Sequence, residues 1–386
     1  MPLPDLAAEL GALDARGLRR QRRILESPQS AHVVVDGRAA VSFCSNDYLG
    51  LAADPRLIAA AHEGAQRWGV GAGASHLILG HTAPHHALEE ALARFVRLPR
   101  ALLFSTGYMA NIGVVTALVG RADAIFADKL NHASLNDAAL LSRADFRRYA
   151  HADLASLEKL LATSTARRKL VATDAVFSMD GDIAPVPELL RLCERYDAWL
   201  LLDDAHGFGV LGADGGGILR HFNLASPRIV YMATLGKAAG VSGAFVSGEP
   251  DLIETLVQRA RTYIYTTATP PMLAHALLAS IGIIAAEQWR RDALARLIDQ
   301  LKHGVAGLRW RLMPSDTAIQ PLVIGGNDEA LRAAAALAAR GVQVPAIRPP
   351  TVPPGSARLR ISLSAAHSER DVAQLVSALH EVEKEA

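Results

Sequence analysis

Short apolar runs alternate with longer stretches of helical periodicity between about residues 55 and 248. The runs are apolar on both faces, which is typical of strands in a sheet that helices cover on each side. Alternating strands and helices predict an α/β fold with a largely parallel, doubly wound sheet. The predicted strands cover residues 101–104, 124–127, 170–175, 199–203, 229–233 and 244–247.

The two ends of the chain have a different pattern. Residues 4–26 predict an amphipathic, arginine-rich helix, and residues 32–44 predict a short hairpin that turns at Asp36-Gly37. After residue 290 the pattern predicts helices over 291–308, 328–340 and 369–383 and strands over 319–324 and 357–363. The predicted parts are an N-terminal helix and hairpin segment (1–45), a large domain (46–288) and a smaller α+β domain (289–386).

Composition narrows the class of protein. Half of the 386 residues are hydrophobic, one fifth are charged and the formal net charge is +1, which excludes a disordered chain and gives no sign of a nucleic-acid or membrane partner. Cys44 and Cys193 lack disulfide or zinc spacing, and Asp5 and Glu9 lie where a signal peptide would be apolar, so we expect a cytoplasmic protein. The apolar run 272–286 is shorter than the roughly 20 residues that span a bilayer and predicts a buried helix.

Lysine is scarce, which makes one lysine stand out. It occurs only at positions 129, 159, 169, 237, 302 and 384. Five of these have charged or helical surroundings, whereas Lys237 follows the apolar run 229–233 in a glycine-containing loop. Because burial disfavours the ammonium form, a lysine at a buried strand end is suited to form an imine with a carbonyl cofactor. An ordinary loop lysine is the alternative, and this motif alone does not decide between them.

A second strand end carries acids. The apolar run 199–203 ends in Asp203 and Asp204, and His206 follows. A carboxylate at a buried strand end needs a cationic partner or several hydrogen-bond donors. A protonated pyridine nitrogen would be such a partner, and the alternatives are a metal site or a structural acid.

Three weaker signals lie at other strand ends. Gly107 opens a helix after the strand ending at Phe104, where free N–H groups can hold a phosphate, although an ordinary helix start is the favoured interpretation. His132 and Ser178 also follow strands, and a lone histidine is more often structural. Together, the five strand ends supply the groups that hold pyridoxal 5′-phosphate.

Two further segments resemble ligand motifs but have a simpler interpretation. The glycine-rich residues 69–75 follow a helix and not a strand, so they do not fit a dinucleotide loop. The histidines and acids at positions 81, 85, 86, 89 and 90 resemble metal ligands. Thr82 and Pro84 instead mark a helix start, so we predict the first turn of a helix there and no metal site.

Seven motifs in order along the chain resemble those of the α-oxoamine synthases. They are SNDYLGL (45–51), FSTGYMAN (104–111), DKLNHAS (128–134), VFSMDGD (176–182), LLDDAHGFG (201–209), TLGKAAGVSGA (234–244) and RPPTVPPGSARLRISLSAAH (348–367). These fold-type I pyridoxal-phosphate enzymes join an amino acid to an acyl thioester with loss of carbon dioxide. The resemblance runs from about residue 13 to the C-terminus. It implies a large domain with a mostly parallel seven-stranded sheet covered by helices, and a smaller α+β C-terminal domain.

The resemblance implies a role for each matching residue. Lys237 would form the Schiff base, Asp203 would pair with the pyridine nitrogen, and His132 would stack on the ring and act in catalysis. The other implied cofactor contacts are Ser178 and His206 at the phenolic oxygen, Gly107, Tyr108 and Thr234 at the phosphate, and Thr266 and Thr267 at the neighbouring subunit's phosphate. The implied substrate contacts are Asn46 and Arg360 for the amino-acid carboxylate and Arg20 and Thr351 for the acyl substrate, with Arg19 as the alternative to Arg20. His132 is also an implied substrate contact, placed to polarise the thioester carbonyl.

The resemblance also implies partners. It implies an obligate homodimer with its active site at the subunit interface. The segment AIRPPTVPPG and the compact length favour L-alanine and a pimeloyl thioester as substrates. Glycine-using relatives of the 2-amino-3-ketobutyrate CoA ligase or 5-aminolevulinate synthase type are the first alternative. A non-catalytic partner subunit is the second, and the presence of Lys237, Asp203 and His132 argues against it.

Overall fold

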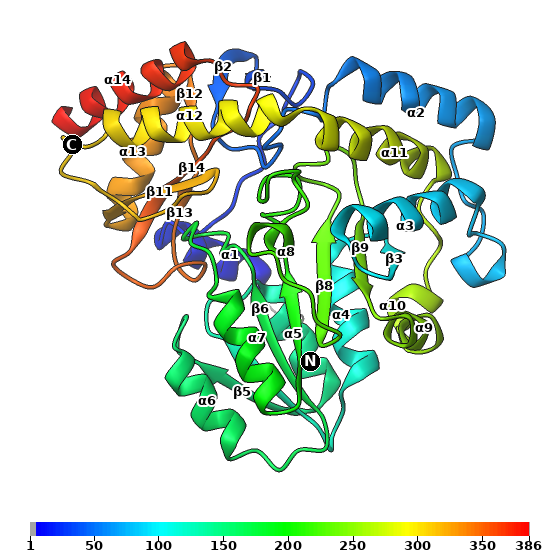
Figure 1. Ribbon diagram of the computed structural model, residues 1–386. Helices are drawn as coiled ribbons and strands as arrows, with labels where there is room; N and C mark the ends of the chain where they lie inside the picture. Colours follow the sequence, from blue (N-terminus) through cyan, green and yellow to red (C-terminus); the bar gives the residue numbers. More distant parts are fainter. Residues whose placement is uncertain (1–4, 386) are drawn as a thin grey trace. The chain divides into compact units, whose positions relative to one another are not determined.

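The apolar runs between residues 100 and 248 pair into one seven-stranded sheet in the computed structural model, which describes residues 5–385 (Figure 1). The chain divides into two units. The sheet unit comprises Leu49–Ser178 and Asp182–Asp292, and the terminal unit comprises residues 5–48, Met179–Gly181 and residues 293–385.

The sheet unit contains the predicted α/β fold. Its sheet order is β3-β9-β8-β7-β6-β4-β5, in which the strands from β8 to β5 are parallel and β9 is antiparallel to both of its neighbours. Its strands are β3 (Arg100–Phe104), β4 (Ala124–Asp128), β5 (Asp145–Tyr149), β6 (Lys169–Asp174), β7 (Ala198–Asp203), β8 (Ile229–Thr234) and β9 (Ala244–Gly248).

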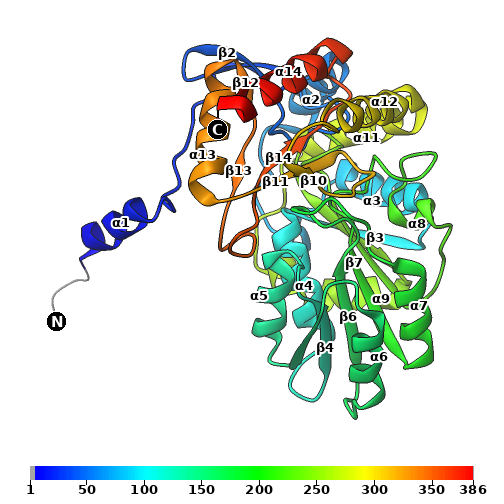
Figure 2. The same cartoon turned by 90° about the vertical axis from the view of Figure 1, so that its left-hand side faces the viewer.

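Helices cover both faces of this sheet. Figure 2 shows α4 and α5 on one side and α6 and α7 on the other, which explains why the central strands are apolar on both faces. The helices of the sheet unit are α2 (Pro55–Trp68), α3 (Ala83–Val96), α4 (Gly107–Leu118), α5 (Ala133–Ser142), α6 (Leu154–Ala162), α7 (Val186–Arg195), α8 (Ile218–His221), α9 (Pro250–Arg259), α10 (Arg261–Ile264) and α11 (Pro271–Ala286), with a 3₁₀ turn at His76–Ile78.

The apolar run 272–286 forms the predicted buried helix. It is α11, which lies beside α2 (Figure 1). Gly64 permits this close approach, because a Cβ there would lie 3.0 Å from the Cα of Met272. Among the described residues no single helix is long and apolar enough to cross a membrane, and α11 and α12 (Gln288–Gly304) meet the length and hydropathy only as a pair bent by 66°.

The terminal unit has two small sheets with the orders β1-β2-β12 and β10-β11-β14-β13. Arg358 and Arg360 lie two residues apart on β14, so both side chains leave the same face of that strand. The elements are α1 (Leu6–Ala15), β1 (His32–Val35), β2 (Arg38–Ser42), α12 (Gln288–Gly304, which begins in the sheet unit), β10 (Arg311–Leu312), β11 (Ile319–Gly325), α13 (Asn327–Ala339), β12 (Val342–Gln343), β13 (Ala346–Ile347), β14 (Ala357–Ser362) and α14 (Glu369–Glu385).

Two sequence predictions of elements were wrong. The N-terminal helix was predicted over residues 4–26, of which residue 4 lies outside the described residues, but α1 ends at Ala15. Gly17 follows with φ +61°, a left-handed conformation that ends a helix. Strand β5 was missed because its sequence, DFRRY, is charged and lies at the sheet edge, where an apolar run is not required.

Candidate functional site

A cavity of about 210 Å³ lies in the sheet unit, at the carboxyl ends of the parallel strands. In doubly wound sheets this edge is the usual place for a ligand. The cavity brings together eight of the residues predicted from the sequence and adds four that were not predicted. Its lining consists of Gly107, Tyr108, His132, Ser134, Asp174, Ser178, Asp203, Ala205, His206, Met232, Thr234 and Lys237.

Lys237 projects into this cavity from the loop after β8. Its Nζ lies 2.9 Å from Nε2 of His206, which follows β7. The loop closes on itself through Gly240, whose N–H donates to the Lys237 carbonyl oxygen at 2.8 Å. Gly240 has φ +71°, and a Cβ there would come within 2.7 Å of Leu51, so only glycine fits. The backbone therefore fixes where the lysine amine enters the cavity.

The structure separates the two acids at the end of β7. Asp203 faces the cavity, and it accepts hydrogen bonds from Nδ2 of Asn111 at 2.8 Å and from the N–H of Ala205 at 3.1 Å. Among the described residues, no lysine, arginine or histidine side chain forms an ion pair with it within 4 Å. Because this carboxylate is almost fully buried beside neutral donors, it is suited to a cationic group of a ligand.

Asp204 points into the protein core instead. Its Oδ2 accepts hydrogen bonds from the N–H of Ile218 at 2.7 Å and from the hydroxyl of Tyr231 at 2.8 Å. Burial raises the pKa of Asp204 to about 7 despite these bonds. A Cβ on Gly207 or Gly217 would lie 2.1 Å from its carboxylate oxygens, so glycines enclose this acid. Asp204 is therefore a structural acid.

The start of α4 offers donors for an anion. Thr106 is the N-cap residue, and its side chain and carbonyl oxygen accept from the N–H groups of Met109 and Ala110. The N–H groups of Gly107 and Tyr108 have no such acceptor in the described part of the chain, and both residues line the cavity. The nearby Thr234 hydroxyl donates to the carbonyl oxygen of Gly243 at 3.0 Å, so it must rotate before it can donate to a ligand.

Four side chains form a hydrogen-bonded chain along the cavity wall. Nδ2 of Asn111 donates both to Asp203 and to the hydroxyl oxygen of Ser134, each at 2.8 Å, and this hydroxyl lies 2.8 Å from Nδ1 of His132. Asn111 and Ser134 are fully buried. They lie inside two of the sequence motifs, but a buried amide and hydroxyl have no sequence signal of their own, because the packing of α4 on α5 decides their contacts.

Asp174 is a further unpredicted member of the cavity. It ends β6 directly opposite Asp203 in the strand register, and its two oxygens accept from the backbone N–H of His132 at 3.3 and 3.1 Å. Burial and, second, the charge of Asp203 raise the pKa of Asp174 well above its usual range. The cavity therefore holds a second buried acid directly beside Asp203.

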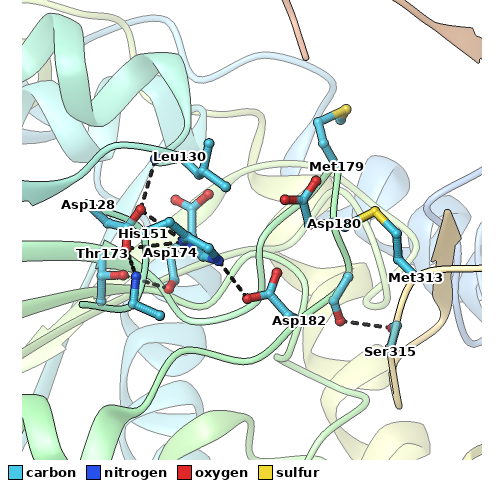
Figure 3. Close-up of polar contacts among 12 residues, drawn as sticks. Asp128, Leu130, His151, Thr173, Asp174, Met179, Asp180, Asp182, Met313 and Ser315 are labelled. Atoms are coloured by element: carbon cyan, nitrogen blue, oxygen red, sulfur yellow. Dashed lines mark hydrogen bonds and ion pairs between the residues drawn. The ribbon is translucent and has the colours of Figure 1, made fainter. Parts of the chain in front are cut away.

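A second cluster of acids at this edge has its own cation. His151, two residues after β5, places Nδ1 3.1 Å from Asp128 and Nε2 2.9 Å from Asp182 (Figure 3). Hydrogen bonds to Asp128 first, and then to Asp182, raise the pKa of His151 to about 10. An imidazolium thus links the end of β4 to the turn that follows Ser178. Neither acid nor this histidine was singled out from the sequence.

The predicted substrate residues other than His132 lie in the terminal unit. Arg360 donates through Nη1 and Nη2 to Oδ1 of Asn46, each at 3.2 Å, and through Nη1 to the Ser362 hydroxyl at 2.7 Å. Its neighbour Arg358 is instead bound by the carboxylate of Asp180. The structure therefore brings Asn46 and Arg360 together as the resemblance implied.

The other predicted contacts lie on exposed segments. Arg19 and Arg20 are both exposed, and Arg19 forms an ion pair with Asp14 at 2.6 Å. Thr351 is exposed in the loop before β14. In the sheet unit, Thr266 and Thr267 follow α10 and do not belong to the described lining of the cavity.

The histidines around position 85 form the predicted helix start. The N–H of Thr82 donates to Nδ1 of His85 at 3.1 Å, so Nε2 carries the proton and donates to the Thr269 carbonyl oxygen at 2.9 Å. His85 thus caps α3. His81, His86 and Glu89 place one ligand atom each within 4.8 Å of one another, although no ion was predicted there.

The chain is similar to known proteins along almost its whole length. Residues 38–379 match the model of the family Aminotransferase class I and II. The chain is 66% identical over 370 residues to 8-amino-7-oxononanoate synthase of Nitrosospira multiformis, covering 96% of this chain and 93% of that protein.

Solved structures give the same result. A structure of SPT with a PLP internal aldimine has a TM-score of 0.93 at 29% identity, covering 99% of this chain and 97% of that one. The 8-amino-7-oxononanoate synthase of Francisella tularensis has a TM-score of 0.78 at 31% identity, covering 90% of this chain and 97% of that one. The fold predicted from the sequence, a fold-type I α/β transferase with a mostly parallel seven-stranded sheet, is confirmed.

Proposed function

Because the chain belongs to the class I and II aminotransferase family and, within it, to the 8-amino-7-oxononanoate synthases, we propose that it condenses L-alanine with a pimeloyl thioester. The products are 8-amino-7-oxononanoate, carbon dioxide and the free thiol, and the reaction belongs to biotin biosynthesis. The acyl donor is pimeloyl-CoA or a pimeloyl-carrier protein. The observation that carries this proposal is the single cavity that collects Lys237, Asp203 and the start of α4.

The groups of the cavity fit pyridoxal 5′-phosphate. The N–H groups of Gly107 and Tyr108 fit the phosphate, and a Cβ added to Gly107 would point at Met232 and Thr234 across the cavity. Asp203, buried and without a cationic partner in the described part of the chain, fits a protonated ring nitrogen. Ser178 and His206 are suited to the phenolic oxygen. When bound, this cofactor supplies an aldehyde that condenses with amines and a cationic ring that withdraws electrons from the amino-acid α-carbon.

The residues of the chain then have separate tasks. The Lys237 amine would be the nucleophile that holds the cofactor, and as a free amine it would be the base that takes the α-proton of the substrate. Asp203 would keep the proton on the ring nitrogen. His132 donates a hydrogen bond to the thioester carbonyl oxygen, where negative charge develops. Arg360, held by Asn46, binds the amino-acid carboxylate through its planar guanidinium.

Three parts of this proposal concern the whole enzyme. We propose that Lys237 forms the Schiff base and that the enzyme is a homodimer in the cytoplasm. Thr266 and Thr267 would reach the neighbouring subunit's phosphate, and Arg20 and Thr351 would contact the acyl substrate. These roles rest on the sequence motifs.

A competition assay tests the proposed reaction. The purified holoenzyme is given equimolar alanine and glycine with pimeloyl-CoA, acetyl-CoA and succinyl-CoA, and the products are identified by mass spectrometry. We expect 8-amino-7-oxononanoate as the main product. A main product formed from glycine and a short acyl group would contradict the proposed substrates and favour the glycine-using alternative.

A further inference from the structure

The hydrogen bonds that link Asp203 to His132 have a defined donor and acceptor at each step. Their direction decides which ring nitrogen of His132 carries the proton. Both oxygens of Asp203 accept from N–H groups, one from Asn111 and one from Ala205. This is the arrangement of an ionised carboxylate, which accepts hydrogen bonds and donates none. The first link in the chain is therefore a donor on Asn111.

The orientation of the Asn111 amide follows from that link. Its NH₂ group uses one hydrogen for Asp203 and the other for the Ser134 hydroxyl oxygen. Its Oδ1 is buried without a hydrogen-bond partner among the described residues. The reversed amide would place Oδ1 against the Asp203 carboxylate, where two acceptors repel each other. An unsatisfied Oδ1 is thus tolerated because the NH₂ group is needed at both contacts.

The Ser134 hydroxyl transmits this direction to His132. Its oxygen accepts from Asn111 and lies 2.8 Å from Nδ1 of His132, so the hydroxyl can donate its hydrogen to this nitrogen. The backbone N–H of Ser134 also points at Nδ1, at 3.3 Å, and a backbone N–H can only donate. Nδ1 therefore accepts from two sides, and in a neutral imidazole the proton lies on Nε2.

We propose that Asn111 and Ser134 are positioning residues that hold His132 as the neutral tautomer with its proton on Nε2. With Nδ1 turned to Ser134, Nε2 is the ring nitrogen left for the ligand side of the cavity that His132 lines. His132 is then a hydrogen-bond donor and not a base. Together with the proposed function, on which this step rests, the tautomer assigns proton removal to Lys237 and polarisation of the thioester carbonyl to His132.

The tautomer can be measured without any turnover. In long-range ¹⁵N–¹H spectra of the full chain labelled at histidine, a protonated ring nitrogen and an unprotonated one have separate chemical shifts. The signals of His132 are identified among those of the 14 histidines as the set that disappears in His132→Gln. We expect Nδ1 to be unprotonated and Nε2 to be protonated. A proton on Nδ1 in the wild-type chain would overturn the proposal.

Two variants of Ser134 test its role. Ser134→Ala removes the hydroxyl donor and leaves Nδ1 of His132 only the longer contact with the backbone N–H, at 3.3 Å, so we expect a mixture of tautomers at His132. Ser134→Thr keeps a hydroxyl and should restore the wild-type pattern. Ser142→Ala is the matched control, because Ser142 is also a buried serine on α5 but its hydroxyl donates to the Ala139 carbonyl oxygen. Asn111→Ala independently interrupts the hydrogen bonds between Asp203 and Ser134, so it should also give a mixture of tautomers at His132. An unchanged His132 signature in Ser134→Ala would overturn the proposal.

Kinetics then separates this inference from the proposed function. Since Nε2–H acts on the acyl carbonyl, Ser134→Ala should lower kcat about 10-fold, the size expected for one weakened hydrogen bond, with less than about a threefold change in KM for the amino acid. A change in KM alone would contradict a positioning role. Wild-type protein that lacks the proposed activity but shows the expected tautomer would contradict only the proposed function.

Discussion

Two groups of acids at the same edge of the sheet meet positive charge in different ways. Asp128 and Asp182 share the imidazolium of His151, so the chain supplies their cation. Asp203 is equally part of this edge, but its described partners are an amide and a backbone N–H. The comparison supports the proposed role of Asp203, because a strand-end acid that has neutral donors and no cation among the described residues can bind a cationic group of a ligand.

The largest effect on turnover is expected when the cavity that contains Asp203 loses the nucleophile Lys237. Lys237→Ala removes both the imine-forming amine and the proposed base, so turnover should fall by about 10⁴-fold, the upper end for one acid–base group. The absorbance of the bound cofactor should change from that of an imine to that of the free aldehyde. Wild-type turnover in this variant would show that Lys237 is neither the imine-forming amine nor the base.

A smaller loss is expected for the acid that lacks a built-in cation. Asp203→Asn keeps the shape of the side chain but removes the charge that holds the proton on the ring nitrogen. We expect kcat to fall about 10²- to 10³-fold, as for the loss of one preorganised electrostatic contact. Steady-state kinetics at saturating cofactor measures this, and a loss below threefold would mean that Asp203 does not meet the ring.

The neighbouring acid provides the matched control. Asp204→Asn should leave kcat within about threefold, because its contacts are structural. The substitution should instead change how the free energy of unfolding depends on pH. Burial raises the pKa of Asp204 to about 7, so the folded state holds a proton that the unfolded state loses near pH 4, and folding weakens as pH rises from about 4 to 7. The variant should lose this part of the pH dependence in urea unfolding, whereas an unchanged slope would contradict the assignment.

A substitution of His151, the cation of the other acid group, should change the stability of the fold more than the rate of the reaction. His151→Gln removes two charged hydrogen bonds, so we expect a loss of about 1.5–3 kcal/mol in the free energy of unfolding at pH 6. Since the pKa of His151 is raised to about 10, its contribution is complete below about pH 6.5 and disappears as pH rises through 10. The variant and the wild type should therefore converge near pH 11. A constant difference across this range would exclude the charged pair.

The sequence predicted the parts of the fold that have a strong apolar signal. Runs such as Leu200-Leu201-Leu202 located six of the seven strands, whereas charged β5 was missed and the N-terminal helix was extended past Gly17. In the site, the motifs led to Lys237, Asp203 and His132, because each of these side chains follows the end of a strand and lines the same cavity. Asn111, Ser134 and His151 were not assigned roles, since their significance lies in contacts between segments far apart in the chain.

The most direct test is reduction of the holoenzyme with borohydride followed by peptide mass spectrometry. Reduction fixes an imine to the lysine that formed it. The account predicts one modified peptide, with the mass of the reduced pyridoxal phosphate adduct on Lys237. An adduct on another lysine, or none at all, would contradict it.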